Sequence, residues 1–184
     1  KCETWWSNGK QKIVEYYKEG WRDGTYLSYY ENGIHNTQSV YVSGKLQGLS
    51  TTYYESGDIK SQGIYNNGSL ELLQKWWQDG TLQFVETYKD GVQHGDSTYY
   101  IYTSNLVPSP PGSYINARGS YCNGIICGSW IYGQLIAIVS EQDGSTVIGW
   151  EYRTRTEDYG SVGSTYTTVN PNPYPVVQQQ KETR

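Results

Sequence analysis

The chain is poor in the residues that build most catalytic and metal sites. It has only two histidines, His35 and His94, and no methionine. His94 falls between Gly91 and Gly95, so we expect a solvated turn residue there and a surface position for His35. The sequence contains no G-x-S-x-G motif, no Walker motif and no D-x-D-x-D-G calcium loop. We therefore predict that the protein is not an enzyme and uses no metal or cofactor.

Charge of either sign is also scarce. Charged residues make up 17% of the chain, and 14 Lys and Arg against 18 Asp and Glu give a net charge of −4. A mildly acidic chain is a poor electrostatic partner for nucleic acid or for an anionic membrane. No stretch approaches the roughly 20 apolar residues of a membrane-spanning helix. We therefore predict no nucleic-acid partner and no membrane span.

Methionine is missing even from position 1, so we expect a processed product or an excised segment. Hydrophobic residues are only 36% of the chain, which by itself would favour disorder. The aromatics argue otherwise, because 20 Tyr, 7 Trp and 1 Phe make up 15% of the residues, and disordered segments are poor in them. Each aromatic side chain buries roughly 150–250 Å². A few of them are enough to stabilise a thin fold.

The aromatic residues recur with a period of 23–24 residues. Adjacent aromatic pairs are followed, in the first four copies, by two polar residues and a glycine. A separate series of single tyrosines keeps the same period, so several independent positions stay in phase and indicate a tandem repeat. The pairs are Trp5-Trp6, Tyr29-Tyr30, Tyr53-Tyr54, Trp76-Trp77 and Tyr99-Tyr100, and the single tyrosines are Tyr17, Tyr41, Tyr65 and Tyr88.

Each repeat carries its own turn chemistry. Asn-Gly, Asp-Gly and Ser-Gly steps allow positive φ and are typical of hairpin turns. The segments between turns are six to ten residues long and rich in Tyr, Trp, Thr, Val and Ile, which prefer strands. We therefore predict an all-β fold, an elongated antiparallel meander of stacked β-hairpin repeats with two strands and two turns per unit.

Neighbouring residues on a strand point to opposite faces, so each aromatic pair contributes to two ladders, one on each face of the sheet. We interpret these ladders as packing residues. An exposed stacking surface for sugars or for another protein remains the alternative. The ladder residues are Tyr29, Tyr30, Tyr53, Tyr54, Trp76, Trp77, Tyr99 and Tyr100.

The repeat pattern has a family resemblance. The segments Tyr29–Gly33 and Tyr41–Gly44, with Gly48 after them, follow a pattern that resembles the bacterial variant of the MORN repeat. The copy at residues 76–95 is a close match, and the resemblance covers roughly residues 4–100, with a degenerate copy after them. It implies a sheet of stacked hairpins with a binding or scaffolding role, and some relatives are labelled antitoxins of toxin–antitoxin systems. A fold of this kind does not specify an activity.

The second half of the chain departs from the repeat. We predict four parts: four hairpin repeats and the start of a fifth over 1–100, a Pro-rich loop insertion over 101–118, a degenerate repeat and closing hairpin over 119–159, and an extended Pro-rich C-terminal tail over 160–184. Within the third part, Trp130 is expected to open a strand. The tail is interpreted either as disordered or as a strand that adds to another sheet edge.

The first repeat lacks a capping unit, since Trp5-Trp6 comes almost at once. An exposed strand with two tryptophans needs a cover, which could be the tail of the same chain or the end of a neighbouring copy. Contacts that do not close give a filament. We therefore predict a structural protein that assembles with copies of itself, as a fibre outside the cell or at its surface. The predicted interface comprises Trp5, Trp6, Leu135, Ile136, Ile138, Val139, Tyr166, Val169, Tyr174, Val176 and Val177.

Two other functions stay open at this point. One is a soluble binding module of the immunity or antitoxin type, which would be cytoplasmic and would dock one protein on an aromatic face. The other is binding of glycans along an exposed aromatic ladder. Size-exclusion chromatography separates the first from a polymer, and titration with oligosaccharides tests the second.

The three cysteines and one sequon allow covalent links. Cys122 and Cys127 flank a four-residue turn that would bring them within disulfide reach. Cys2 is then unpaired or joins another molecule, and we expect no zinc site because no second Cys pair is present. Asn67 begins an Asn-Gly-Ser sequon at a predicted turn tip, so it is the glycosylation candidate if the chain is secreted.

Overall fold

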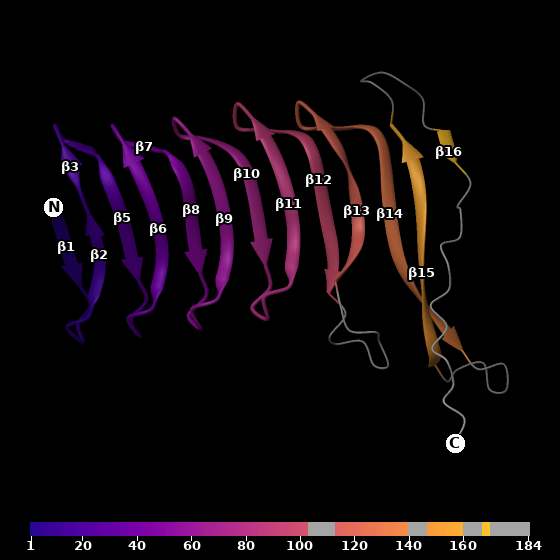
Figure 1. Cartoon of the computed structure of the whole chain (residues 1–184), viewed down its shortest axis with the longest axis horizontal. Helices are drawn as coiled ribbons and strands as arrows, with labels where there is room; N and C mark the ends of the chain where they lie inside the picture. Colours follow the sequence, from indigo (N-terminus) through magenta and orange to yellow (C-terminus); the bar gives the residue numbers. More distant parts are fainter. Residues whose placement is uncertain (103–112, 140–146, 160–166, 170–184) are drawn as a thin grey trace. The chain divides into compact units, whose positions relative to one another are not determined.

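The computed structural model describes residues 1–102, 113–139, 147–159 and 167–169 (Figure 1). All the regular elements in these ranges are β-strands, which confirms the predicted all-β class. The strands are β1 (Cys2–Trp5), β2 (Gln11–Glu15), β3 (Tyr17–Lys18), β4 (Trp21–Arg22), β5 (Gly24–Tyr29), β6 (His35–Val42), β7 (Lys45–Leu46), β8 (Gly48–Tyr53), β9 (Ile59–Asn66), β10 (Ser69–Trp76), β11 (Leu82–Lys89), β12 (Val92–Tyr102), β13 (Ser113–Cys122), β14 (Ile125–Val139), β15 (Val147–Asp158) and β16 (Thr167–Val169).

The chain divides into two compact units, residues 1–95 and 96–184, and β12 begins in the first and ends in the second. In the first unit, hydrogen-bonded strands follow the order β1-β2-β5-β6-β8-β9-β10-β11, while β7 pairs with β6 and β3 pairs with β4. In the second unit the order is β12-β13-β14-β15-β16. Neighbours in each order are consecutive or nearly consecutive in the chain and the pairings are antiparallel, so the predicted meander is confirmed.

One kind of turn joins strands directly after an aromatic pair. At the first of these turns, Gly9 N donates to Trp6 O (3.0 Å) and Trp6 N donates to Lys10 O (2.8 Å). Gly9 has φ +81°, a conformation that is costly for any residue with a side chain. A glycine therefore ends the three-residue loop. The same conformation returns, with positive φ, at Gly33, Gly57 and Gly80.

The other kind of turn follows the single-tyrosine series. Here two adjacent residues both have positive φ, the signature of a type I′ turn, whose twist matches that of the flanking strands. The second residue is glycine in every case, and the first is a polar residue that tolerates the left-handed region. These turns are Glu19-Gly20, Ser43-Gly44, Asn67-Gly68, Asp90-Gly91 and Asn123-Gly124.

The sheet buries few side chains completely. Among the described side chains, the buried hydrophobic residues are Val14, Cys127 and Trp130. Val14 lies opposite Leu27 on the neighbouring strand, and the next repeat places Thr51, which is also buried, at the position equivalent to Leu27. Stability in the repeats therefore depends on half-buried rows and on hydrogen bonds between units, rather than on one central core.

Three sequence expectations need correction. His94 lies in β12 and not in a turn, because the Asp90-Gly91 type I′ turn needs only two residues and the strand resumes at Val92. Trp130 lies in the middle of β14 rather than at the start of a strand, since the chain stays extended through Gly128 despite its φ of +65°. Within the proposed insertion over 101–118, residues 101–102 belong to β12 and 113–118 to β13, and the rest lie outside the described residues.

Candidate functional site

The described part of the chain offers little catalytic or metal-site chemistry. Within it, no three His, Cys, Asp or Glu side chains are grouped so that they could hold a metal ion. The same ranges contain no helix with the length and apolar character needed to cross a membrane. The feature that distinguishes one part of the sheet from the rest is the outer edge of its first strand.

Strand β1 pairs with β2 on one side and is the first strand of its sheet. No strand in the described part of the chain lies on its other side. Trp5 is 55% exposed on this strand, and Cys2 is an exposed free thiol. A strand edge with open backbone groups is a template for pairing with another chain. We call the outer side of β1 the β1 edge.

The charges at the β1 edge are locally balanced. Lys1 Nζ lies 2.8 Å from Glu3 Oε1, and this hydrogen bond raises the pKa of Lys1. Both side chains are partly exposed, so the pair contributes little to stability. Because the two charges compensate each other, neither of them repels an approaching partner.

In the first three aromatic pairs, the second residue links its repeat to the next. Its ring nitrogen or hydroxyl donates a hydrogen bond to the backbone carbonyl of the first aromatic residue of the following pair. The aromatic pairs therefore tie successive hairpins together as well as packing between them. The bonds are Trp6 Nε1 to Tyr29 O (3.1 Å), Tyr30 Oη to Tyr53 O (2.6 Å) and Tyr54 Oη to Trp76 O (2.8 Å).

An asparagine ladder accompanies these bonds at the three-residue turns. Asn8 Nδ2 donates to Glu31 O (2.8 Å), and Asn32 Nδ2 donates to Glu55 O (2.9 Å). Each asparagine also accepts a backbone N–H within its own turn through Oδ1. The Asn-Gly step thus shapes the turn and joins it to the next one.

The type I′ turns are linked in a similar way at the opposite ends of the strands. Asp23 Oδ2 accepts Ser43 N at 3.0 Å, and the equivalent Gln47 Oε1 accepts Asn67 N at 2.9 Å. Backbone bonds add to each link, since the turn glycine N–H donates to the preceding repeat. These are Gly44 N to Arg22 O (2.7 Å) and Gly68 N to Leu46 O (2.8 Å).

One acceptor of these aromatic bonds lies at the β1 edge without a described side-chain donor. Trp5 O is equivalent to Tyr29 O, but no described side chain donates to it. The β1 edge therefore presents the same kind of acceptor carbonyl that the internal aromatic bonds pair.

The ladder hydroxyl can be tested by removing it alone. Tyr54→Phe should lower the free energy of unfolding by about 0.5–1.5 kcal/mol, because the ring stays while the bond to Trp76 O is lost. The matched control is Tyr29→Phe, since Tyr29 contributes its ring to a contact with His35 at 4.6 Å. Urea unfolding of both variants measures the difference. Equal losses would contradict a specific role for the Tyr54 hydroxyl.

The predicted interface residues fall in different places. Trp5 lies at the β1 edge, whereas Trp6 is half-buried under Lys12, whose Nζ is 4.3 Å from the ring centroid. Residues 135–139 lie in β14, between β13 and β15, so the predicted terminal position was wrong: the apolar run belongs to an internal strand. Val169 is in β16, and Tyr166, Tyr174, Val176 and Val177 lie outside the described residues.

The aromatic ladder residues are mostly half-buried. Trp77 is the exception at 40% exposure. His35 is exposed, as predicted for a surface residue, and its ring is near those of Tyr29 and Tyr53 at 4.6 and 6.1 Å. Asn67 is exposed at its type I′ turn, the turn-tip position predicted for a sugar acceptor.

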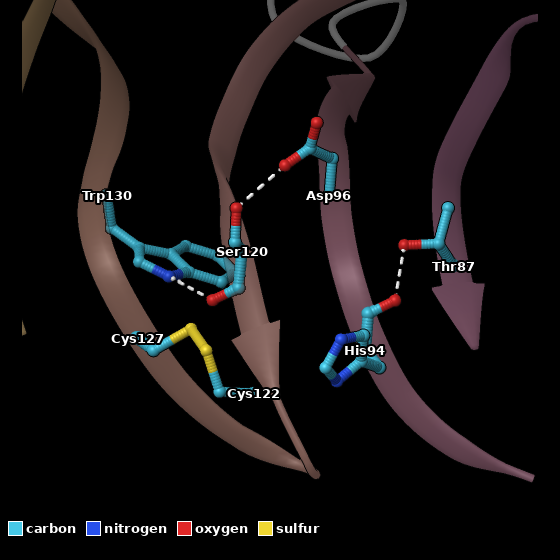
Figure 2. Close-up of a disulfide and its surroundings, with 7 residues drawn as sticks. All are labelled: Thr87, His94, Asp96, Ser120, Cys122, Cys127 and Trp130. Atoms are coloured by element: carbon cyan, nitrogen blue, oxygen red, sulfur yellow. Dashed lines mark hydrogen bonds between the residues drawn. A yellow bond between two sulfur atoms is a disulfide. The ribbon is translucent and has the colours of Figure 1, made fainter. Parts of the chain in front are cut away.

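The second unit has a small core of its own. The structure joins Cys122 and Cys127 in a disulfide with a Cα–Cα distance of 5.8 Å (Figure 2). Beside it, Trp130 is 2% exposed, and its Nε1 donates to Ser120 O at 3.0 Å (Figure 2). Ser120 Oγ in turn donates to Asp96 Oδ1 at 2.7 Å, which ties β13 to β12.

Tyr159 is a structural residue that the sequence reasoning missed. Its N–H donates to Gly128 O (2.8 Å), which places it in the single-tyrosine series, where Tyr41 lies opposite Gly24. Its hydroxyl donates to Glu157, and this bond, together with the one shared with Tyr132, raises the pKa of Tyr159. The only sequence signal was a tyrosine at the end of a strand-like run, displaced from the period by the longer hairpin.

Comparison with known families agrees with the repeat geometry. Residues 22–42 and 46–67 match the MORN repeat variant family, which confirms the resemblance over these residues. The matched segments include the junctions formed by Asp23 and Gln47. No curated protein matches the chain. MORN repeats are generally non-catalytic repeat modules.

Proposed function

Taking these MORN-variant repeats as the premise, we propose that the protein is a non-catalytic β-sheet module that associates with copies of itself through strand edges. The observation that carries the proposal is the β1 edge, where Trp5 is 55% exposed and Trp5 O meets no described side-chain donor. A second copy that supplies a strand there would pair with the backbone of β1 in the way that the internal strands pair.

The energetic gain from such pairing is moderate. A tryptophan side chain buries roughly 150–250 Å², and at about 25 cal/mol per Å² the exposed half of Trp5 contributes a few kcal/mol before ordering costs. Backbone bonds to the edge add to this gain. Association should therefore depend on protein concentration, and it should become stronger as the strands of two copies pair.

Repetition of this contact without closure gives a filament, so we propose an extended fibre outside the cell. The Cys122–Cys127 disulfide supports this location, because disulfides persist in oxidising compartments. The exposed sequon residue Asn67 is available to a glycosylating enzyme there.

Sedimentation velocity over a concentration series tests self-association. The unmodified chain should form larger species as concentration rises, and Trp5→Ser should shift this to at least ~10-fold higher concentration, since ~1.4 kcal/mol is a factor of ten. Leu49→Ser is the matched control, because Leu49 is 53% exposed on the internal strand β8. A monomer at every concentration, or equal effects of the two variants, would overturn the proposal.

A soluble protein-binding module is the second candidate, and one surface favours it. Leu49 lies opposite Ile64, and the register of β6 and β8 brings Val40 opposite Leu49. These three side chains are 53%, 41% and 42% exposed, so they form an apolar row away from the β1 edge. Exposed apolar rows are common at protein interfaces. If this candidate is right, the chain should be monomeric, and Leu49→Ser should weaken its binding to the partner.

A further inference from the structure

We infer that β1 of one copy pairs with β15 of a second copy in place of that copy's own β16, which leaves this edge when the two copies associate. The inference depends on the proposed self-association and adds the second surface and the register. β15 pairs with β14 through eleven residue pairs, Ser129 with Asp158 through Val139 with Val147, whereas β16 covers only Thr156–Asp158 on the other side.

The strands of both units alternate between two kinds. Entry strands lead into a single tyrosine and, where the turn is described, a type I′ turn, while return strands lead back from it. Entry and return strands alternate in each sheet order. β1 is a return strand with no described entry strand beside its outer edge, and β15 is an entry strand whose outer neighbour is the short β16. The entry strands are β2, β6, β9, β11, β13 and β15, and the return strands are β1, β5, β8, β10, β12 and β14.

The internal pairs of entry and return strands specify a register for this contact. In each of them, the residue three positions before the single tyrosine lies opposite the residue two positions before the next aromatic pair. β15 uses the same position for its outer pairing, because Thr156, three before Tyr159, lies opposite Val169 of β16. In β1 the residue two before Trp5-Trp6 is Glu3. The internal examples are Val14 with Leu27, Gln38 with Thr51, and Gln62 with Gln74.

Placing Glu3 opposite Thr156 aligns the rest of the two strands. Antiparallel pairing then sets Cys2 opposite Glu157 and Thr4 opposite Arg155 of the second copy. It also sets Lys1 opposite Asp158. The Arg155 side chain is 62% exposed, so it is accessible to an approaching strand.

The native thiol of Cys2 makes the register measurable. In the variant Glu157→Cys, mild oxidation should join Cys2 of one copy to the introduced thiol of the next, because cross-strand neighbours lie within disulfide reach. Since each molecule then carries both partners, non-reducing electrophoresis should show a ladder of covalent species beyond the dimer. Adding Cys2→Ser should remove the ladder, and the unmodified chain, with Cys2 alone, should stop at the dimer.

Thr156→Cys is the register control, because Thr156 points to the opposite face from Glu157 and should give no ladder with Cys2. Equal ladders from both variants, or none from Glu157→Cys, would overturn the pairing. A second design, Thr4→Cys with Arg155→Cys and Cys2→Ser, tests the same register without altering Glu157 and its bond to Tyr159. It should also give a ladder.

Sedimentation of the reduced variants separates this inference from the proposed function. If the chain associates but neither design gives a ladder, the β1–β15 pairing is wrong while self-association stands. If the chain stays monomeric at all concentrations, both are wrong. A charge test gives the same distinction: Thr4→Lys, opposite Arg155, should weaken association at least several-fold, whereas Thr4→Glu should not.

Discussion

Replacing Trp130 with alanine is expected to lower the free energy of unfolding of the second unit by about 3–5 kcal/mol. The indole is 2% exposed and lies between aromatic neighbours, with ring-centroid distances of 5.1 Å to Tyr121, 6.1 Å to Tyr132 and 6.4 Å to Tyr99. Its removal leaves a large void and takes away the donor to Ser120 O. A loss of this size is a large fraction of the roughly 5–15 kcal/mol that stabilises a typical domain.

Urea unfolding and amide hydrogen exchange measure this effect. Exchange should accelerate in the strands around the indole in Trp130→Ala, β13 and the first half of β14, while the first repeats keep their protection. Trp77→Ala is the control, because Trp77 is 40% exposed and its truncation should cost less. A loss under about 1 kcal/mol for Trp130→Ala would contradict the assignment of Trp130 as the centre of this core.

The second large effect is expected at Gly119, directly against the same indole. A Cβ atom on Gly119 would lie 2.4 Å from Trp130 Cγ and Cδ2, far inside van der Waals contact. Gly119→Ala should therefore cost about 1–3 kcal/mol or more, because the buried ring must move. The reason for this glycine is the close approach of the ring and not a turn.

A double-mutant cycle tests that explanation. If the cost comes from the collision with the ring, Gly119→Ala should be much less harmful in a Trp130→Ala background, with a coupling of about 0.5–3 kcal/mol. Urea unfolding of the four proteins gives the coupling. An unchanged cost in the two backgrounds would place the strain elsewhere.

The repeat architecture was predictable because the residues within each turn specify its conformation. Asn-Gly at residues 8–9 and Asp-Gly at 90–91 specify their conformations through glycine and a polar neighbour, without help from distant residues. The period then assigned equivalent positions to successive units. His94 and Trp130 were misplaced because the type I′ turn is shorter than the glycine spacing implied, and because an extended chain can pass through a glycine with positive φ.

The hydrogen-bond ladders were beyond the sequence reasoning. A period shows that Trp6 and Tyr30 are equivalent, but not which atom of one unit each of them meets in the next. That relation depends on strand register, including shifts such as the one between Ser28 and Tyr29. Tyr159 was missed for a related reason, because the long β14–β15 hairpin displaces it from the period.

The predicted assembly interface stays a prediction, but the structure describes where some of its residues lie. Trp5, one of the predicted interface residues, is exposed on the first strand of its sheet. Residues 135–139 were assigned to the opposite end because they are the most apolar run. A strongly hydrophobic run is typical of a strand with neighbours on both sides. These residues therefore lie in an internal strand and not at an edge.

The equivalence of the bonds that begin at Trp6, Tyr30 and Tyr54 has a consequence for how such chains change over generations. Each unit offers its successor the same contacts that it receives from its predecessor. Recombination that deletes or duplicates one block of codons for 23 or 24 residues therefore leaves the flanking units with matching neighbours. Length becomes a trait that a lineage can adjust in whole steps, with no new interface to evolve.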